Sequence, residues 1–486
     1  MPPGVIIVGL GPGDREYWTL EADQILSTAT EVYLRTVHHP STAAIVARTH
    51  SFDSWYEANG DLETTHHRIA AEIVGLGQRP AGVIYAVPGH PAIGQATVSR
   101  IQTLAATSKL PVRMVAGLSP IEPALTALGI DRSSQLQIAE AAEIAANHHP
   151  ALEPDRPALI TMLHGRPLAA RIKRTLLNAY SDKLVVTLIQ AAGTDLARTS
   201  SCQLGSLDGQ IQLNDQLTML YLPADISQGG FSTLQETIAH LRAPHGCPWD
   251  REQTHQTLRP FLIEETYEVL EALDSEDPAA LAEELGDLLL QVVLHTQIAI
   301  DTGEFKMGEV IDHINRKLRR RHPHVFGEVV VNGVSEVTTN WEAIKQAEKA
   351  AKGQSGERPS TLDGIPAALP ALAQALAVSN RAVRVGFEWP DIEGIMDKII
   401  EEAREISEAA DPRQLEAEIG DLLFSVVNLA RWQQVDPESA LRATNARFSR
   451  RFRHMEQAAA LQGRRLTDLT LDEMENLWTA AKRQEQ

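Results

Sequence analysis

Cysteine is nearly absent from this chain of 486 residues, which contains only Cys202 and Cys247. A small secreted protein held together by disulfides needs a much denser set of cysteines, so the composition excludes that class. The two residues are expected in different domains, and free thiols of this kind fit a reducing compartment. We therefore expect a cytoplasmic protein without a disulfide framework.

Positive charge is also scarce. The chain has 44 Lys and Arg against 64 Asp and Glu, which gives a formal net charge of −20 and a pI of about 5.3. Such a surface repels phosphate backbones and anionic lipids, so we expect no nucleic-acid polymer and no membrane as a partner. Local basic patches remain, and a nucleotide substrate is therefore compatible with the composition.

Long apolar runs are missing as well. The best candidate, residues 285–300, is interrupted by Asp287, Gln291, His295 and Gln297, so it is unsuited to cross a bilayer. The N-terminal run that ends at Val8 lacks a basic region before its few apolar residues. It therefore predicts a strand rather than a signal peptide.

The length of the chain and two changes of pattern predict a multidomain protein of three domains. Up to residue 223, short β-branched runs alternate with helical patterns, which is typical of an α/β fold. From about residue 233 the chain is strongly helical. We predict an α/β domain (1–223), a linker (224–232), a first all-α domain (233–350), a second linker (351–360) and a second all-α domain (361–486). The expected strands are Val5–Val8, Val83–Val87, Val112–Ala116, Ala158–Leu163, Leu184–Ile189 and Leu217–Leu222.

Several of these strands end in glycine-rich loops, where open α/β sheets bind their ligands. The loop Gly9–Gly13 contains Pro12 and departs from Gly-x-Gly-x-x-Gly, so it is not a dinucleotide fingerprint. Three segments together resemble the motifs of the tetrapyrrole methylase family, over residues 4–223. They are Val8-Gly-Leu-Gly-Pro-Gly-Asp14, Pro88-Gly-His-Pro-Ala-Ile93 and Ala116-Gly-Leu-Ser-Pro120. The second motif more often carries Asp where this chain has His90.

The resemblance to tetrapyrrole methylases implies a two-lobed α/β domain that holds S-adenosylmethionine in its cleft. It also implies an additional methyltransferase activity. By position, the residues that would line the methionine and adenosine pocket are Pro12, Gly89, His90, Ile93, Ser119 and His164.

Carboxylates recur at helical spacing in the C-terminal half. Glu264, Glu265 and Glu268 lie within one helical turn, and Glu284 and Asp287 are three residues apart further along. Residues three and four apart share one face of a helix. We therefore expect five carboxylates from two adjacent helices to converge on one spot.

The same acidic pattern returns later in the chain, as Glu401, Glu402 and Glu405 followed by Glu418 and Asp421. Glu401 follows Glu264 by 137 residues, and Asp421 follows Asp287 by 134. Other residues recur in the same order and at similar offsets, which indicates a duplicated unit. The recurring pairs are Trp249 and Trp389, Asn315 and Asn445, Arg320 and Arg450, Trp341 and Trp478, and Lys345 and Lys482.

Converging carboxylates need a cation, because two like charges ~4 Å apart repel by about 4 kcal/mol at an intermediate dielectric. Asp287 lies in a helix that is apolar on most sides and is therefore expected to be buried, where an Asp must be paired or bind metal. Oxygen-only ligands suit Mg²⁺ or Mn²⁺ rather than Zn²⁺. No histidine has the spacing of a zinc protease, and pairs such as His38-His39 are expected in loops or at the surface. Solvated acidic helix faces are the alternative, which the duplication disfavours.

Basic and aromatic residues accompany both acidic sets. Lys398 precedes Glu401 by three residues and shares its helix face, whereas the first copy has Phe261 at the matching position. Cations beside metal-binding carboxylates suit a polyphosphate, although intrahelical ion pairing is the alternative for each of them. The tryptophans either stack on a base or belong to a core. The candidate substrate-binding residues are Trp249, Asn315, Arg319, Lys345, Trp389, Lys398, Asn445, Arg450 and Lys482.

The acidic repeats resemble the all-α nucleotide pyrophosphohydrolases known as MazG, over about residues 230–486. The matching segments are Cys247-Pro-Trp-Asp250, Glu264-Glu-Thr-Tyr-Glu268, Arg321-His-Pro-His-Val-Phe326 and Trp341-Glu-Ala-Ile-Lys345. The resemblance implies that each acidic set binds Mg²⁺. It further implies cleavage of nucleoside triphosphates between the α and β phosphates, and a homodimer with sites at helix interfaces.

We hypothesise a Mg²⁺-dependent nucleoside triphosphate pyrophosphohydrolase, a hydrolase acting on acid anhydrides, in which Glu265 or Glu402 orients the attacking water. Both repeats keep all five carboxylates, and Lys398 favours the second as the more active. The alternative is an S-adenosylmethionine-dependent methyltransferase whose helical half serves regulation or dimerisation. Two complete acidic sets disfavour a non-catalytic scaffold, and the missing Glu-x-x-His element disfavours a di-iron bundle.

Overall fold

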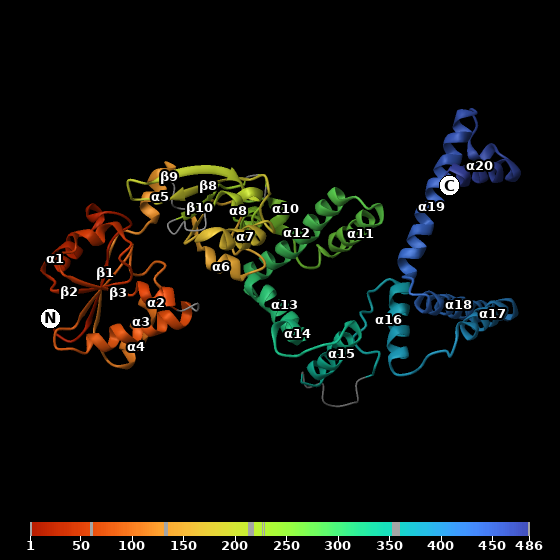
Figure 1. Cartoon of the computed structure of the whole chain (residues 1–486). Helices are drawn as coiled ribbons and strands as arrows, with labels where there is room; N and C mark the ends of the chain where they lie inside the picture. The colour runs from red at the N-terminus through yellow and green to blue at the C-terminus, as the bar shows by residue number, and fades with distance from the viewer. Residues whose placement is uncertain are drawn as a thin grey trace. The chain divides into compact units, whose positions relative to one another are not determined.

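The computed structural model describes residues 2–58, 62–130, 135–211, 218–225, 227, 229–351 and 360–484 (Figure 1). The chain divides into two compact units, Met1–Glu252 and Gln253–Gln486. The first unit includes α9 (Phe231–Arg242), which begins within the last two residues of the first predicted linker, and α10 (Pro248–Glu252). Residues 226 and 228 of that linker, and residues 352–359 of the second, lie outside the described residues.

The first lobe of the first unit is a parallel five-stranded sheet in the order β3-β2-β4-β1-β5. Its central strands consist mainly of apolar side chains that are buried on both faces, as a parallel sheet covered by helices requires. Helices α3 and α4 pack on one face, and α1 packs on the other. The bounds are β1 Val5–Gly9, α1 Leu20–Thr28, β2 Glu31–Leu34, β3 Arg48–Ser51, α2 Asp53–Ala58, α3 Leu62–Gly77, β4 Val83–Val87, α4 Ala96–Thr107 and β5 Val112–Val115, with 3-10 turns at Arg15–Tyr17 and Pro40–Ala44.

The second lobe is a mixed sheet in the order β6-β7-β10-β8-β9, in which only β6 and β7 are parallel neighbours. Side chains from α6, α7 and α8 fill the core on one face, and α5 packs on the other. The bounds are α5 Ile121–Leu128, β6 Gln137–Glu140, α6 Ala141–Ala146, β7 Ala158–Thr161, α7 Gly165–Leu176, β8 Val185–Gln190, β9 Arg198–Gln203, a 3-10 turn Leu204–Ser206, α8 Leu207–Gln210 and β10 Thr218–Leu222. The predicted two-lobed α/β fold is confirmed.

The six expected strands are present as β1, β4, β5, β7, β8 and β10, except that residue 217 lies outside the described residues. Sequence analysis missed β2, β3, β6 and β9. Three of these, β3, β6 and β9, are edge strands. An edge strand buries fewer side chains and therefore carries a weaker apolar signal, as the exposed run of β9 shows.

The second unit is entirely helical in its described residues, which confirms the predicted all-α half. Helix α11 packs along α12, and α17 packs along α18, while α16 packs against α18 and α19 (Figure 1). The bounds are α11 Arg259–Ser275, α12 Pro278–Thr302, α13 Met307–Arg321, α14 Pro323–Phe326, α15 Val334–Ala351, α16 Ala371–Arg384, α17 Ile392–Glu408, α18 Pro412–Trp432, α19 Pro437–Leu461 and α20 Leu471–Gln484, with a 3-10 turn at Leu466–Asp468.

An identical cap begins the second acidic helix of each repeat. The Asp277 carboxylate accepts hydrogen bonds from the first backbone N–H groups of α12, and Asp411 does the same for α18. Each Asp is followed by proline at the first helical position, Pro278 or Pro412, where a missing N–H costs nothing. These caps fix where each helix starts, at equivalent positions of the two repeats.

The expected burial of α12 and its Asp287 is only partial in the single chain, where Asp287 is half-buried. Leu285, Leu289 and Val292 are exposed along one stripe of α12, and the matching stripe of α18 is exposed as well. None of the described helices is both long enough and apolar enough to cross a membrane.

Candidate functional site

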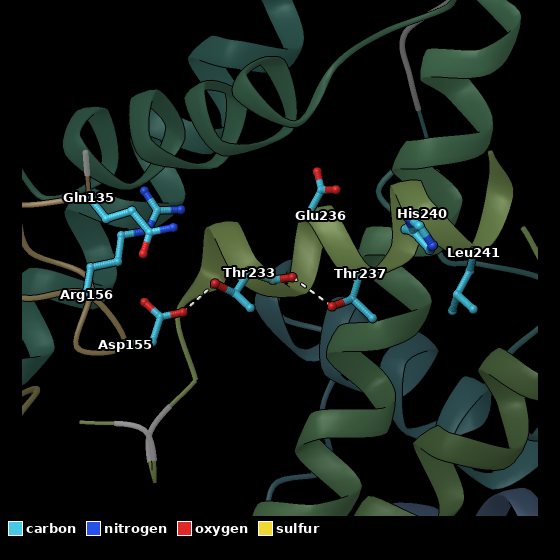
Figure 2. A pocket seen from close by; sticks show the side chains of 8 residues that line it. All are labelled: Gln135, Asp155, Arg156, Thr233, Glu236, Thr237, His240 and Leu241. Carbon is cyan, nitrogen blue, oxygen red and sulfur yellow. Dashed lines mark hydrogen bonds between the residues drawn. The ribbon is translucent and has the colours of Figure 1, made fainter. Parts of the chain in front are cut away.

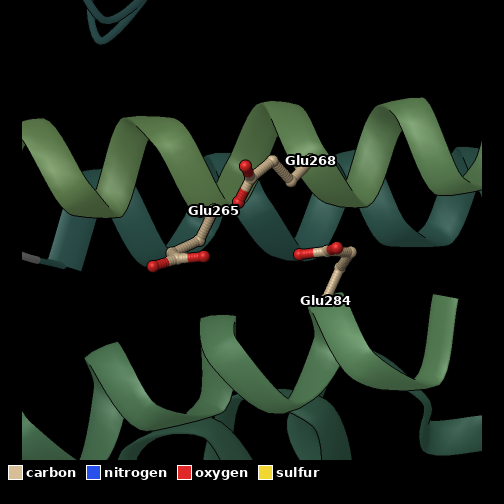
Figure 3. Close-up of side chains that lie close together, drawn as sticks. All are labelled: Glu265, Glu268 and Glu284. Carbon is tan, nitrogen blue, oxygen red and sulfur yellow. The ribbon is translucent and has the colours of Figure 1, made fainter. Parts of the chain in front are cut away.

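The first acidic cluster lies between α11 and α12. Glu265 and Glu268 project from α11 toward Glu284 of α12, and one carboxylate oxygen of each lies within 4.8 Å of the others (Figure 3). The three- and four-residue spacings place these groups on the facing sides of the two helices. Asp287, one turn after Glu284, is close enough for its charge to act on Glu265 and Glu284.

Mutual repulsion marks this first cluster. Burial, followed by the charges of Asp287 and Glu268, raises the pKa of Glu265. Burial and the charges of Glu268 and Asp287 likewise raise the pKa of Glu284. The buried Gln291 amide donates a hydrogen bond of 3.5 Å to Glu265, which is a neutral and weak compensation. A cation at this cluster would offset the repulsion.

The second cluster joins Glu402 of α17 to Glu418 and Asp421 of α18, again with one oxygen of each within 4.8 Å of the others. Glu402 is the most enclosed of them, with 3% of its surface exposed. Burial, together with the charges of Glu418 and Glu402, raises the pKa of Glu405 nearby. Glu265 and Glu284 of the first cluster correspond to Glu402 and Glu418 of the second, whereas the third member differs, Glu268 in one and Asp421 in the other.

Lys398 reaches into the second cluster. Its Nζ lies 2.7 Å from Glu402 Oε1 and 3.2 Å from Glu401 Oε1, so the predicted shared helix face is observed. These carboxylates, Glu402 first, raise the pKa of Lys398. The first repeat has Phe261 at the equivalent position.

Of the ten predicted metal ligands, the structure gathers three in each repeat. Asp287 and Glu405 lie beside the clusters, within electrostatic reach. Glu264 lies on the exposed surface of α11, and Glu401 pairs with Lys398. The metal-binding role of all ten stays a prediction.

The donor set of both clusters fits a hard divalent cation. All ligand atoms are carboxylate oxygens, the type that Mg²⁺ and Mn²⁺ prefer. Glu402 supplies a second sign, because its Oε2 is buried and has no hydrogen-bond partner among the described residues. A buried carboxylate oxygen without a partner is costly, and a metal ion would satisfy it.

The other predicted substrate-binding residues lie on α10, on the chain just before α17, and on the later helices of each repeat. The tryptophans of the later helices, Trp341 of α15 and Trp478 of α20, each make a cation–π contact. Arg321 lies over the ring of Trp341, and Arg451 lies over the ring of Trp478. Contact of the candidates with a nucleotide stays a prediction. Trp249 lies on α10, Trp389 before α17, Asn315 and Arg319 on α13, Lys345 on α15, Asn445 and Arg450 on α19, and Lys482 on α20.

Glycine-rich loops meet at the carboxyl ends of the strands in the first unit. A Cβ added to Gly9 would lie 2.6 Å from the Gly89 carbonyl oxygen and 2.7 Å from the Gly117 nitrogen. A Cβ on Gly13 would overlap the Gly193 carbonyl oxygen of the other lobe. These approaches require glycine, and they bring loops of both lobes together at the edge where α/β folds bind ligands.

The predicted cofactor pocket follows these loops. Ser119 is buried, accepts a hydrogen bond from the Ile121 N–H and donates one to Glu122. His90 Nδ1 accepts from the Ala92 N–H, which leaves its proton on Nε2 when the ring is neutral. The remaining members lie after strand ends: Pro12 after β1, Gly89 and Ile93 after β4, and His164 after β7.

One residue at this edge was missed by sequence analysis. His39 is in a loop, as expected, but it is buried, and its Nε2 has no hydrogen-bond partner among the described residues. Burial lowers its pKa, against the opposing influence of the Gly11 backbone and Asp14. The only signal was the pair His38-His39 before Pro40, and it was uninformative because the short strand β2 ahead of it went unrecognised.

A hollow of about 510 Å³ lies against α9 (Figure 2). Glu153 accepts hydrogen bonds from the backbone N–H and the hydroxyl of Ser232, and so caps the first turn of α9. Asp155 accepts a hydrogen bond from the Thr233 hydroxyl of the same turn. We therefore assign these groups to holding α9 on the α/β unit. The lining residues are Gln135, Asp155, Arg156, Thr233, Glu236, Thr237, His240 and Leu241.

Two family models match the chain. The model of the MazG nucleotide pyrophosphohydrolase domain matches residues 253–326 and 391–456, and that of tetrapyrrole (corrin/porphyrin) methylases matches residues 4–208. Both predicted resemblances are thereby confirmed.

Similar proteins include one that resembles the whole chain. The uncharacterized protein YabN of Bacillus subtilis is 38% identical over 99% of each chain. The nucleoside triphosphate pyrophosphohydrolase/pyrophosphatase MazG of Thermotoga maritima is 46% identical over 52% of this chain and 95% of its own. The nucleoside triphosphate pyrophosphohydrolase of Escherichia coli K12 is 45% identical over 51% and 95%. Among solved structures, the uroporphyrin-III-C-methyltransferase of Thermus thermophilus aligns at 18% identity and a TM-score of 0.36, over 47% of this chain and 95% of that one.

Because the carboxylates of the first cluster repel one another, we expect Glu284→Gln to have opposite effects on the melting temperature without and with a bound metal ion. Because the folded state raises the pKa of Glu284 above 4.5, the metal-free fold loses stability as pH rises through that raised value. In EDTA the substitution should raise the melting temperature, and more at about pH 7 than at about pH 5. In saturating Mn²⁺ the substitution should lower the melting temperature, because a metal ligand is lost.

Differential scanning calorimetry of both proteins at each pH measures this effect, and taking the difference between them cancels the titration of histidines. Glu328→Gln, an exposed carboxylate after α14, is the control and should change little in either condition. An equal effect of Glu284→Gln in EDTA and in Mn²⁺ would contradict the account.

Proposed function

This chain belongs to the MazG nucleotide pyrophosphohydrolase family and carries a tetrapyrrole methylase domain ahead of its two MazG regions, and we propose that it hydrolyses nucleoside triphosphates to monophosphate and pyrophosphate. The observation that carries this proposal is the duplicated convergence of three carboxylates between paired helices. The relatives from Thermotoga maritima and Escherichia coli bear the name of this activity.

The roles of the residues follow from their chemistry. The acidic clusters would hold Mg²⁺ or Mn²⁺, which neutralises developing phosphate charge and makes water a better nucleophile. Glu265 in the first repeat, or Glu402 in the second, orients the water that attacks the α-phosphorus. The Arg and Lys side chains on α13, α15, α19 and α20 bind the β and γ phosphates.

We propose the second repeat as the more active one. Its Lys398 adds an ammonium group beside the carboxylates, where the first repeat has the apolar Phe261. A polyphosphate carries several negative charges, and an extra cation at the cluster lowers the free energy of the transition state.

Substitution of the two central carboxylates tests both the activity and its location. With Mg²⁺ and a panel of nucleoside triphosphates, the chain should release pyrophosphate rather than phosphate. Loss of a residue that only supports a metal ligand typically lowers activity by about 10–100-fold. Glu402→Gln should lower kcat/KM by at least that much, and Glu265→Gln should lower it by less. Glu408→Gln, exposed on the same helix as Glu402, is the matched control.

Release of phosphate instead of pyrophosphate would contradict the reaction. Loss of activity from Glu265→Gln alone would contradict only the preference for the second repeat.

A homodimer is the assembly that we propose. The apolar stripe Leu285, Leu289 and Val292 on α12 recurs at matching positions on α18, and both are exposed in the single chain. Apolar stripes at this helical spacing are normally buried against other helices. A second copy supplies identical stripes and would bury them.

Sedimentation velocity should find a particle of about twice the 53.2 kDa chain mass. Leu289→Glu should shift the population toward the monomer, whereas Val330→Glu, an exposed apolar residue outside the stripes, should leave it unchanged. A monomeric parent protein at micromolar concentration would refute the dimer.

A second candidate function is S-adenosylmethionine-dependent methyl transfer by the first unit, with the helical half as a regulatory or dimerisation module. The specific observation in its favour is the close approach of Gly9, Gly89 and Gly117, together with the contact between Gly13 and Gly193 of the other lobe. The buried Ser119 and the fixed ring of His90 offer polar groups at the same edge.

Titration calorimetry of the full chain with S-adenosylmethionine tests this candidate. We expect saturable heat in the parent protein and binding at least as tight in His90→Asp, which restores the residue more common in the family motif. ATP in place of S-adenosylmethionine is the ligand control. An absence of heat in both proteins would remove the cofactor from the account while leaving the hydrolase untouched.

A further inference from the structure

The two acidic clusters differ in how the equivalent carboxylates Glu402 and Glu265 are compensated. In the second repeat, Glu402 pairs with the Lys398 ammonium at 2.7 Å. In the first, the equivalent Glu265 receives a hydrogen bond of 3.5 Å from the neutral Gln291 amide, and its other neighbours include the acids Glu268 and Asp287. In the first repeat, Phe261 occupies the position equivalent to Lys398, so a difference in amino-acid sequence accounts for the difference in compensation.

Glu402 is poorly suited to remain without a cation. Only 3% of its surface is exposed, and its second oxygen, Oε2, has no hydrogen-bond partner among the described residues. A buried carboxylate is costly unless a positive charge compensates it. Lys398 supplies that charge through Oε1, while Oε2 is still unsatisfied and points to a further ligand.

Two features of Lys398 favour its displacement from Glu402. Its side chain is 37% exposed, and a lysine ammonium sits on a flexible four-carbon stem. A divalent cation bound at Glu402, Glu418 and Asp421 would compete with the ammonium for the same carboxylate and would repel it. The released ammonium would remain tethered next to the cluster.

We propose that Lys398 is a resident counter-cation that stabilises the second cluster without metal and is displaced from Glu402 when a divalent cation binds. Displacement has a cost, so the second cluster binds divalent cations more weakly than the first, where the apolar Phe261 occupies the position of Lys398. The displaced ammonium is then available to the anionic substrate. Only this last step rests on the proposed hydrolase function.

Removal of the lysine should strengthen metal binding. The full chain carrying Glu268→Gln and Glu284→Gln retains the second cluster alone, and it is titrated with Mn²⁺ by calorimetry in the absence of nucleotide. Adding Lys398→Met should tighten Mn²⁺ binding about fivefold, the ratio that about 1 kcal/mol of lost competition produces. Lys398→Arg keeps the charge and should restore the weaker affinity.

The reciprocal substitution provides an independent test. In a full chain carrying Glu418→Gln and Asp421→Asn, which retains the first cluster, Phe261→Lys should weaken Mn²⁺ binding by a similar factor. This variant also answers the question if Lys398→Met fails to fold, as judged by circular dichroism.

Unchanged or weaker Mn²⁺ affinity in Lys398→Met, or unchanged affinity in Phe261→Lys, would overturn the proposal. A lysine that only contacts phosphate would raise the KM for nucleotide and leave Mn²⁺ affinity unaltered, which also counts against it. Because no nucleotide is present in the titrations, failure of the hydrolase assignment would appear separately, as missing pyrophosphate release.

Discussion

Repulsion among carboxylates held between paired helices is the constraint on which the rest of the helical unit depends. In each repeat, the facing sides of two helices carry negatively charged side chains where apolar contacts would otherwise lie. The Asp-Pro caps of α12 and α18 start both helices at equivalent residues and so bring the acids into register. Burial and the neighbouring carboxylates raise the pKa values of Glu265, Glu284 and Glu405, and a cation at either cluster would relieve this repulsion.

The two repeats compensate the repulsion among their carboxylates with different residues. The first uses a buried amide, Gln291, and leaves Glu265 close to other acids. The second uses Lys398, and a serine, Ser425, stands where the first has that amide. The acids are common to both and the compensation is not. The observed difference between the repeats therefore lies in the residues around the carboxylates rather than in the carboxylates themselves.

Much of this architecture was predictable from the sequence, for identifiable reasons. Helical spacing placed Glu265 and Glu268 on one face, and long β-branched runs marked the buried strands such as β1 and β7. Which three of five acids converge was not predictable, because it depends on how α11 is rotated against α12; Glu264, adjacent in sequence to Glu265, faces solvent. The edge strands β3, β6 and β9 escaped detection because they bury little. The burial of His39 escaped because it follows a strand of only four residues.

The central claim is that both acidic clusters gather around divalent cations. Anomalous diffraction from crystals of the full chain grown with Mn²⁺ tests it most directly, because the signal locates the ion without reference to activity. The account predicts anomalous peaks between α11 and α12 at Glu265, Glu268 and Glu284, and between α17 and α18 at Glu402, Glu418 and Asp421. Diffraction without a peak at either cluster, with the carboxylates turned apart into solvent, would contradict it.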